Sequence, residues 1–252
     1  MDNTAKNKLY TYTDYMSYSE NERLEVIDGH IYAMSPTPSR IHQEIISYLV
    51  IEIGNHIKSN KGSCKVYPAP FDVFLFDNET LESCKNIIQP DISVICDKNK
   101  LIDKGCAGAP DLIIEVVSPY NPSNDYVRKL SLYEYFKVRE YWIINPINET
   151  ILIYRLDNTM QYSAPETYTF KDKAKVGIFE NLEINFTDLD LWGEFYINRI
   201  HLINLYYILS DFSCIIISVL SILTSNLSSL SLSGFNSSFN SSVSNMFFIY
   251  YY

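Results

Sequence analysis

Residues 108–119 read Gly-Ala-Pro-Asp-Leu-Ile-Ile-Glu-Val-Val-Ser-Pro, and this segment decides the fold. The run from Leu112 to Val117 is apolar on both faces and is bounded by proline-containing loops, which is typical of a buried central strand. Glu115 lies inside that run. A buried, unpaired carboxylate costs several kcal/mol, so Glu115 requires either a cationic partner or a metal ion.

A second carboxylate opens another β-rich segment, residues 89–96, which read Gln-Pro-Asp-Ile-Ser-Val-Ile-Cys. Side-chain alternation places Asp91 on the face opposite the apolar stripe. A magnesium ion shared by Asp91 and Glu115 would compensate both carboxylates, because Mg²⁺ prefers oxygen ligands and is usually held by one or two carboxylates plus phosphate. A salt bridge from Glu115 to a nearby lysine or arginine explains these two strands equally well.

The segment after the Glu115 strand, residues 125–138, has helical spacing. Asp125 and Lys129 lie four residues apart and share one helix face, which Tyr133 continues by another turn. Lys129 would then approach the end of the strand, where an ammonium could orient a water and offset charge that develops on a phosphate. Spacing alone favours the alternative, a surface ion pair between Asp125 and Lys129 worth about 0.3 to 0.5 kcal/mol.

Upstream, two short strands are predicted on either side of Asp28-Gly29, a pair that suits a tight hairpin turn. Glu25 in the first of these strands is either an exposed strand residue or a further carboxylate for the site. Residues 39–58 have the spacing of an amphipathic helix that begins at a serine. His42 lies on this helix, where most histidines are solvated or structural.

Further strands are predicted where apolar, β-rich runs alternate with turn residues. Together with the flanking helices they predict a mixed α/β sheet in one principal domain. The expected strands are Cys64–Tyr67, Phe71–Phe76, Ile87–Cys96, Glu140–Asn145 and Thr150–Leu156.

The composition changes near Phe195, so we expect a domain over residues 1–195 and a separate C-terminal tail over residues 196–252. The tail contains one basic and one acidic residue, and the net charge of -10 therefore belongs to the preceding part. A poorly structured, Ser/Asn-rich tail is the favoured interpretation, ahead of a membrane-associated helix or core packing. Asp211 would lie near the centre of a membrane span, at a cost of about 2.5 to 3.5 kcal/mol.

The net charge of -10 argues against a protein that coats nucleic acid non-specifically, because phosphate neutralisation needs clustered basic residues. It does not exclude a nuclease, since a bound metal supplies local positive charge. The five cysteines are odd in number and form no C-x-x-C pair, so neither a disulfide framework nor a zinc site is expected. A cytoplasmic, reducing location is predicted, because the N-terminus also lacks the pattern of a secretory signal.

Taken in order, the segments of this chain resemble the Uma family of restriction-endonuclease-like proteins, from about Tyr10 to Phe195. The segments that carry the resemblance are Arg23-Leu-Glu-Val-Ile-Asp-Gly-His-Ile, Met34-Ser-Pro-x-Pro-Ser, His42-Gln-Glu, Pro68-Ala-Pro-Phe-Asp-Val, Gln89-Pro-Asp-Ile-Ser-Val, Gly108-Ala-Pro-Asp-Leu-Ile-Ile-Glu-Val-Val-Ser-Pro, Asp125-x-x-x-Lys129 and Val138-Arg-Glu-Tyr-Trp-Ile-Ile-Asn-Pro.

The family is placed in the PD-(D/E)XK nuclease superfamily. This resemblance implies a central mixed β-sheet flanked by helices and hydrolysis of phosphodiesters that depends on Mg²⁺ or Mn²⁺. Asp91 matches the PD element and Glu115 matches the acidic residue of the second element. Val117 stands where the superfamily pattern places lysine, and Lys129 is the matching candidate for that charge.

We therefore expect an endonuclease that acts on nucleic acid, most simply DNA, with Asp91 and Glu115 as metal ligands. Lys129 would support the attacking water, and Glu25 would assist metal binding or water activation. Nucleases of this superfamily often act as homodimers. The alternative is a catalytically inactive module that keeps the nuclease fold and binds nucleic acid or protein, which the missing strand lysine and the acidic surface favour.

Overall fold

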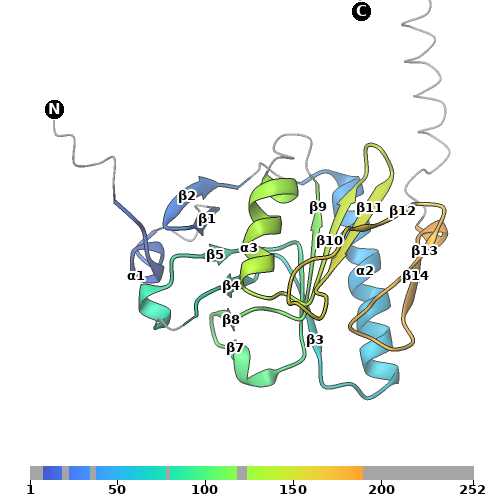
Figure 1. Cartoon of the computed structure of the whole chain (residues 1–252), viewed down its shortest axis with the longest axis horizontal. Coiled ribbons are helices and arrows are strands. Elements are labelled where there is room, and N and C mark those ends of the chain that lie inside the picture. Colours follow the sequence, from blue (N-terminus) through green and yellow to red (C-terminus); the bar gives the residue numbers. More distant parts are fainter. Residues whose placement is uncertain (1–7, 19–22, 35–37, 78–79, 118–123, 190–252) are drawn as a thin grey trace, which may run out of the picture. The chain divides into compact units, whose positions relative to one another are not determined.

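A computed structural model of the chain describes residues 8–18, 23–34, 38–77, 80–117 and 124–189 (Figure 1). The predicted tail and its boundary near Phe195 lie outside the described residues. Within the described part, no helix combines the length and apolar character that a membrane span requires.

The first sheet of the described part has six strands in the order β12-β11-β10-β9-β6-β3. Strand β9, which carries Glu115, lies inside it, parallel to β10 and antiparallel to β6, and all five of its residues are buried. The prediction of a buried central strand is confirmed. The strands are β3 (Lys65–Pro68), β6 (Ile92–Ile95), β9 (Leu112–Val116), β10 (Glu140–Asn145), β11 (Thr150–Arg155) and β12 (Glu166–Thr169).

A second six-stranded sheet of the described residues has the order β2-β1-β5-β4-β8-β7. It is mainly antiparallel, with one parallel pair between β4 and β8. Strands β13 and β14 form a separate two-stranded ribbon. The strands are β1 (Leu24–Ile27), β2 (His30–Ala33), β4 (Asp72–Phe74), β5 (Ile87–Ile88), β7 (Leu101–Ile102), β8 (Gly105–Ala107), β13 (Lys173–Lys175) and β14 (Glu183–Asn185).

The segment predicted as one strand over Ile87–Cys96 is in fact two strands in different sheets. Strand β5 belongs to the second sheet and β6 to the first, and Gln89, Pro90 and Asp91 connect them. Pro90 has no backbone N–H, so it cannot continue a ladder of hydrogen bonds through this point. This break places Asp91 in the segment that connects the two sheets.

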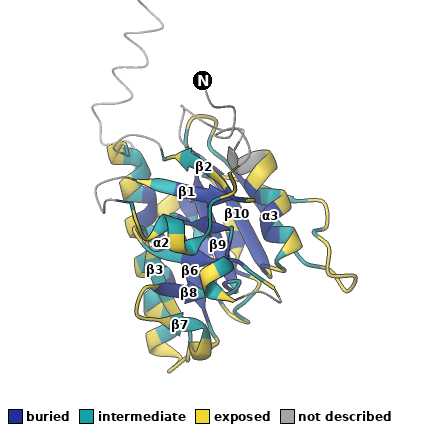
Figure 2. Cartoon of the chain, turned by 90° about the vertical axis from the view of Figure 1, so that its left-hand side faces the viewer, coloured by how far each residue is buried: buried dark blue, intermediate teal, exposed yellow. Residues whose placement is uncertain are grey.

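Two helical segments cover the first sheet, and Figure 2 shows β9 and β10 between α2 and α3. Helix α2 (Arg40–Ser59) matches the predicted helix within one residue at each end, and its N-cap Ser39 accepts a hydrogen bond from the backbone of His42. The predicted helix after β9 begins as a π-helical turn (Asn124–Lys129) and continues as α3 (Leu130–Tyr135). The remaining short helices are α1 (Tyr12–Tyr15), η2 (Leu81–Ser83), η3 (Lys98–Lys100) and η5 (Phe186–Asp188).

The hairpin between β1 and β2 turns as predicted at Asp28-Gly29. Both residues have positive φ, 51° and 74°, as a tight hairpin turn requires. A Cβ atom at Gly29 would also lie 2.9 Å from the Cβ of Leu9, so the turn excludes a side chain there. This hairpin fixes the strand that carries Glu25.

A disulfide joins Cys64 and Cys96, contrary to the sequence-based expectation. Strands β3 and β6 pair antiparallel with Lys65 opposite Ile95, so the residues just outside that pair face each other. The count and spacing of cysteines could not reveal this pairing, because it depends on the register of two strands that are distant in sequence. The bond also weakens one argument for a reducing location, which stays a prediction.

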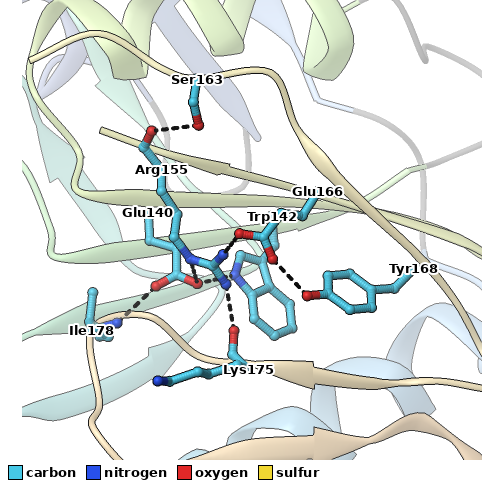
Figure 3. A network of polar contacts seen from close by, with 8 residues as sticks. All are labelled: Glu140, Trp142, Arg155, Ser163, Glu166, Tyr168, Lys175 and Ile178. Atoms are coloured by element: carbon cyan, nitrogen blue, oxygen red, sulfur yellow. Dashed lines mark hydrogen bonds and ion pairs between the residues drawn. The ribbon is translucent and has the colours of Figure 1, made fainter. Parts of the chain in front are cut away.

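Glu140, at the start of β10, is the central residue of a buried polar network (Figure 3). Its side chain accepts hydrogen bonds from Trp142 Nε1 at 2.7 Å, from the backbone of Ile178 at 2.9 Å and from Arg155 Nε at 3.3 Å. A Cβ atom at Gly177 would lie 2.8 Å from Glu140 Oε2 and 2.5 Å from Arg155 Nε. The network thus joins β10 and β11 to the 176–179 turn only because residue 177 is glycine.

Candidate functional site

Three charged side chains from separate parts of the sequence meet in the interior. Lys129 Nζ lies 2.9 Å from Glu115 Oε1 and 3.0 Å from Glu25 Oε1, and each of the three side chains is only 6% exposed. Strands β1 and β9 supply the carboxylates, and the π-helical turn supplies the ammonium. The structure therefore brings together Glu25, Glu115 and Lys129, and the alternatives of an exposed Glu25 and a surface Lys129 are wrong.

Two further donors hold the carboxylates in place. Tyr133 donates its hydroxyl to Glu115 Oε1 at 2.8 Å, in agreement with its predicted position on the Lys129 face. The backbone N–H of Gln89 donates to Glu25 Oε1 at 3.0 Å. These contacts orient both carboxylates, and the second one ties Glu25 to the connection that carries Asp91.

Asp91 contacts the backbone of β9 next to Glu115, and it therefore lies beside this cluster. Its Oδ2 accepts a hydrogen bond from the backbone N–H of Val116, the residue after Glu115, at 2.8 Å. The same oxygen lies 3.2 Å from His42 Nε2. Asp91 is 19% exposed, so it is the most accessible of the predicted site carboxylates.

His42 is a site residue whose role the helix pattern alone did not indicate. It lies in the first turn of α2, is 12% exposed as a side chain, and its buried Nδ1 has no hydrogen-bond partner among the described residues. A histidine three residues after an N-cap serine gave no signal for catalysis, because only the fold brings α2 to the start of β6. His42 contacts the carboxylate most exposed to substrate.

Formal charges in the site do not balance. Among these side chains, Glu25, Asp91 and Glu115 contribute three negative charges and Lys129 one positive charge, a difference of two when His42 is counted as uncharged. Buried charge of one sign is costly unless it is compensated. A divalent cation is equal in magnitude and opposite in sign to this difference.

The donor set also suits a hard cation. Carboxylate oxygens are the ligands that Mg²⁺ and Mn²⁺ prefer, and Mg²⁺ commonly keeps several waters and uses only one or two carboxylates. Among the residues that the structure places, no group of three His, Cys, Asp or Glu side chains forms a ready metal cage. A cation at this site would therefore be held by few protein ligands, and carboxylates are the donors present.

Glu140 shows what a structural buried carboxylate looks like in the same protein. Its two oxygens receive an indole N–H, a backbone N–H and a guanidinium (Figure 3). All three of these donors to Glu140 lie within the 140–178 region, outside the site. By contrast, the contacts of Glu115 and Glu25 join them to Lys129 and to the connection that carries Asp91.

A cleft of about 760 Å³ opens at Asp91. Asp72 and Gln89 line it together with Asp91, and Arg23 and Lys104 contribute basic side chains. Asp91 lines the cleft and the more deeply buried Glu25 and Glu115 do not, so this side is the accessible side of the site.

Asp72 is the second carboxylate in the cleft. Its Oδ1 accepts hydrogen bonds from Gln89 Nε2 at 2.7 Å and from Tyr15 Oη at 3.3 Å. Burial raises the pKa of Asp72 above its ordinary value, and the two donors oppose that shift only in part. Burial, with the neighbouring Asp72 charge, raises the pKa of Tyr15 to about 12, so its hydroxyl remains a donor at neutral pH. Asp72 lies in a segment that carries the family resemblance, but no pattern in the sequence pointed to its contact with Tyr15.

Comparison with known proteins agrees with the fold. A crystal structure described as a "putative nuclease", from Anabaena variabilis, aligns with 71% of this chain and 96% of its own, with a TM-score of 0.57 and 22% sequence identity. At that identity the match supports the fold alone. It confirms the predicted mixed α/β architecture.

Sequence comparison identifies the family. An uncharacterized protein of Synechocystis is 26% identical over 144 residues, which are 56% of this chain and 71% of that protein. Residues 11–187 match the profile of the Uma2 family, which carries the description "Putative restriction endonuclease". Since that match covers well over half of the sequence, the chain belongs to the Uma2 family.

Proposed function

We propose that this protein is a divalent-metal-dependent endonuclease that hydrolyses phosphodiester bonds, with DNA as its substrate. The proposal assigns Asp91 and Glu115 as ligands of Mg²⁺ or Mn²⁺. One observation carries it above the others, namely that the buried Glu25–Lys129–Glu115 cluster lies beside Asp91, a carboxylate that lines a cleft. The family description supports the reaction class.

A divalent cation held there would polarise a phosphoryl oxygen and lower the pKa of a nearby water. The protein side chains perform the remaining tasks. Asp91, fixed by the Val116 N–H, would be the ligand that lines the cleft by which a phosphate would enter. Glu115, fixed by Tyr133, would be the second and more buried ligand.

Lys129 and Glu25 set the charge around those ligands. The Lys129 ammonium lies between the two glutamates, where it neutralises one of them and can offset negative charge that develops on a phosphate. Glu25 in turn holds Lys129 in place. The lysine thus reaches the site from the π-helical turn rather than from the strand position that Val117 occupies.

Cleavage assays with purified full-length protein test this function. Supercoiled, nicked and single-stranded DNA, with RNA alongside, are incubated with Mg²⁺, Mn²⁺ or EDTA. We expect cleavage only with metal, and its reduction to background in Asp91→Asn and Glu115→Gln. Glu180→Gln, the same chemical change at an exposed residue outside the site, is the matched control and should cleave like the wild type.

Unchanged cleavage in Glu115→Gln or Lys129→Met would show that the assigned residues are wrong. Absence of both cleavage and metal binding, with nucleic acid still bound, would instead support the alternative of an inactive module on a nuclease fold. Calorimetric titration with Mn²⁺ separates these two outcomes, because it measures binding without requiring turnover.

A further inference from the structure

The cleft beside Asp91 has the features of a pocket for a flat, polar-edged group. Tyr15 and Tyr18 line it together with Met16, all from the N-terminal segment, and Pro68 and Pro70 line it as well. Aromatic side chains stack on nucleobases regardless of sequence, at about 1 to 3 kcal/mol for each base. A pocket that opens at the proposed metal ligand and carries two tyrosines is therefore suited to a base of the substrate.

The polar groups in the cleft are arranged as acceptors. Gln89 uses its side-chain N–H₂ to bind Asp72 and the Tyr15 hydroxyl, which leaves its amide oxygen as an acceptor. Asp72 accepts from both Gln89 and Tyr15 through Oδ1, which leaves Oδ2 as a second acceptor. Two acceptors on hydrogen-bonded residues of one cleft suit a group that presents more than one donor.

Gln89 also connects the pocket to the charged cluster. Its backbone N–H binds Glu25 while its side chain binds Asp72, so a single residue spans the two sites. A nucleotide could therefore place its base against Asp72 and its phosphate near Asp91. The basic residues Arg23 and Lys104 line the same cleft and suit further phosphates of the strand.

We propose that this cleft binds one unpaired base of the nucleic-acid substrate, with guanine preferred, stacked on Tyr15 and read by Asp72 and Gln89. The inference rests on the proposed function, which it deepens by naming the substrate class. Guanine presents neighbouring ring N–H and amino donors on its Watson–Crick edge, whereas thymine presents a single donor between two acceptors. Because that edge is occupied in a duplex, the base must come from a single strand or be flipped out.

Binding measurements test the proposal without requiring cleavage. Fluorescence anisotropy with Ca²⁺ in place of Mg²⁺ compares labelled oligothymidines that carry one central dG, dI, dA or dT, and the corresponding duplexes. We expect the dG strand to bind about tenfold more tightly than the dT strand, since a good pair of base contacts is worth about 1 to 3 kcal/mol. Inosine, which lacks the exocyclic amino group, should bind at an intermediate level.

Two variants separate base reading from stacking. Asp72→Asn keeps one side-chain oxygen for the Gln89 and Tyr15 donors and replaces the other oxygen, an acceptor, by an N–H₂ donor. This variant should therefore lose the dG preference and still bind the dT strand. Tyr15→Leu should weaken binding of every single strand about fivefold or more. Glu180→Gln should behave like the wild type, and circular dichroism melting confirms that each variant is folded.

Equal affinity for dG and dT strands, a dG preference that survives Asp72→Asn, or duplexes bound at least as tightly as single strands would overturn the inference. The outcome is separable from that of the proposed function. A dG preference without cleavage by any metal would sustain the base pocket and refute the nuclease, whereas metal-dependent cleavage without base preference would do the reverse.

Discussion

Replacing Lys129 by methionine removes the ammonium that lies between Glu25 and Glu115. Both carboxylates are about 6% exposed, and they would be left buried next to each other without their cation. Breaking a buried ion pair by removing one partner costs about 3 to 5 kcal/mol, because a charge remains uncompensated in the interior. For a domain of this size that loss corresponds to a fall of roughly 6 to 20 °C in Tm.

Urea unfolding, followed by circular dichroism in metal-free buffer, measures this loss. Lys173→Met, which makes the same change at an exposed lysine of β13, should shift stability by no more than about 0.5 kcal/mol. The double variant Lys129→Met/Glu115→Gln should recover part of the loss, since one of the two buried charges is then removed. Mn²⁺ should also restore more stability to Lys129→Met than to the wild type.

A loss below about 1 kcal/mol in Lys129→Met would refute the reasoning, because exposed ion pairs have energies of that size. The same conclusion would follow if the double variant were as unstable as the sum of the two single variants. Coupling between the two positions is the signature of a direct buried contact.

Three further changes have defined outcomes. Gly177→Ala should lower stability by about 1 to 3 kcal/mol in thermal melts, because its methyl group overlaps the Glu140 network; a neutral result would contradict that packing. Cys96→Ser removes the disulfide and should lower the free energy of unfolding by about 3 to 4 kcal/mol, by the chain-entropy relation for a separation of 32 residues. Urea unfolding without reductant measures this loss, and the wild type with reductant should have the same stability as the variant. Burial raises the pKa of Asp72 in the folded state, so its negative charge opposes folding at neutral pH. This destabilisation disappears as the pH falls through the raised pKa towards the ordinary value of 3.8. Asp72→Asn should therefore be more stable than the wild type at pH 7, with a difference that shrinks on acidification, and a difference that grows would be inconsistent with the direction of the shift.

The elements that sequence predicted best are those whose pattern is local. The run around Glu115 is apolar on both faces, and β9 is buried on both faces. The helix over residues 39–58 has a serine cap and a regular apolar stripe, and α2 agrees with it closely. The Asp28-Gly29 pair likewise determines its own turn.

Features that depend on pairing between distant segments could not be predicted in this way. The division of Ile87–Cys96 between two sheets follows from which strands neighbour each half, and the pattern of β-rich residues is the same in both halves. The disulfide depends on the register of β3 against β6. Short strands such as β7 and β8 have too few residues for a periodic signal.

The same limit applies to the site. Glu115 could be singled out from the sequence, because a charged carboxylate inside an apolar strand requires a cationic partner or a metal ion. Lys129 and Glu25 each had an ordinary surface interpretation, and only the fold shows that Lys129 pairs with Glu115 and that Glu25 contacts the same ammonium. His42 and Asp72 lie in segments that carry the family resemblance, but no local pattern gave either a role, since their partners are contributed by other elements.

The most direct test of the central claim is anomalous diffraction from crystals of the full-length protein soaked with Mn²⁺. The account predicts one strong peak at about 2.1 Å from carboxylate oxygens of both Asp91 and Glu115, with Lys129 still bound to Glu25, and loss of the peak in Glu115→Gln. A peak elsewhere in the molecule, or no peak while wild-type protein cleaves DNA in the same buffer, would contradict it.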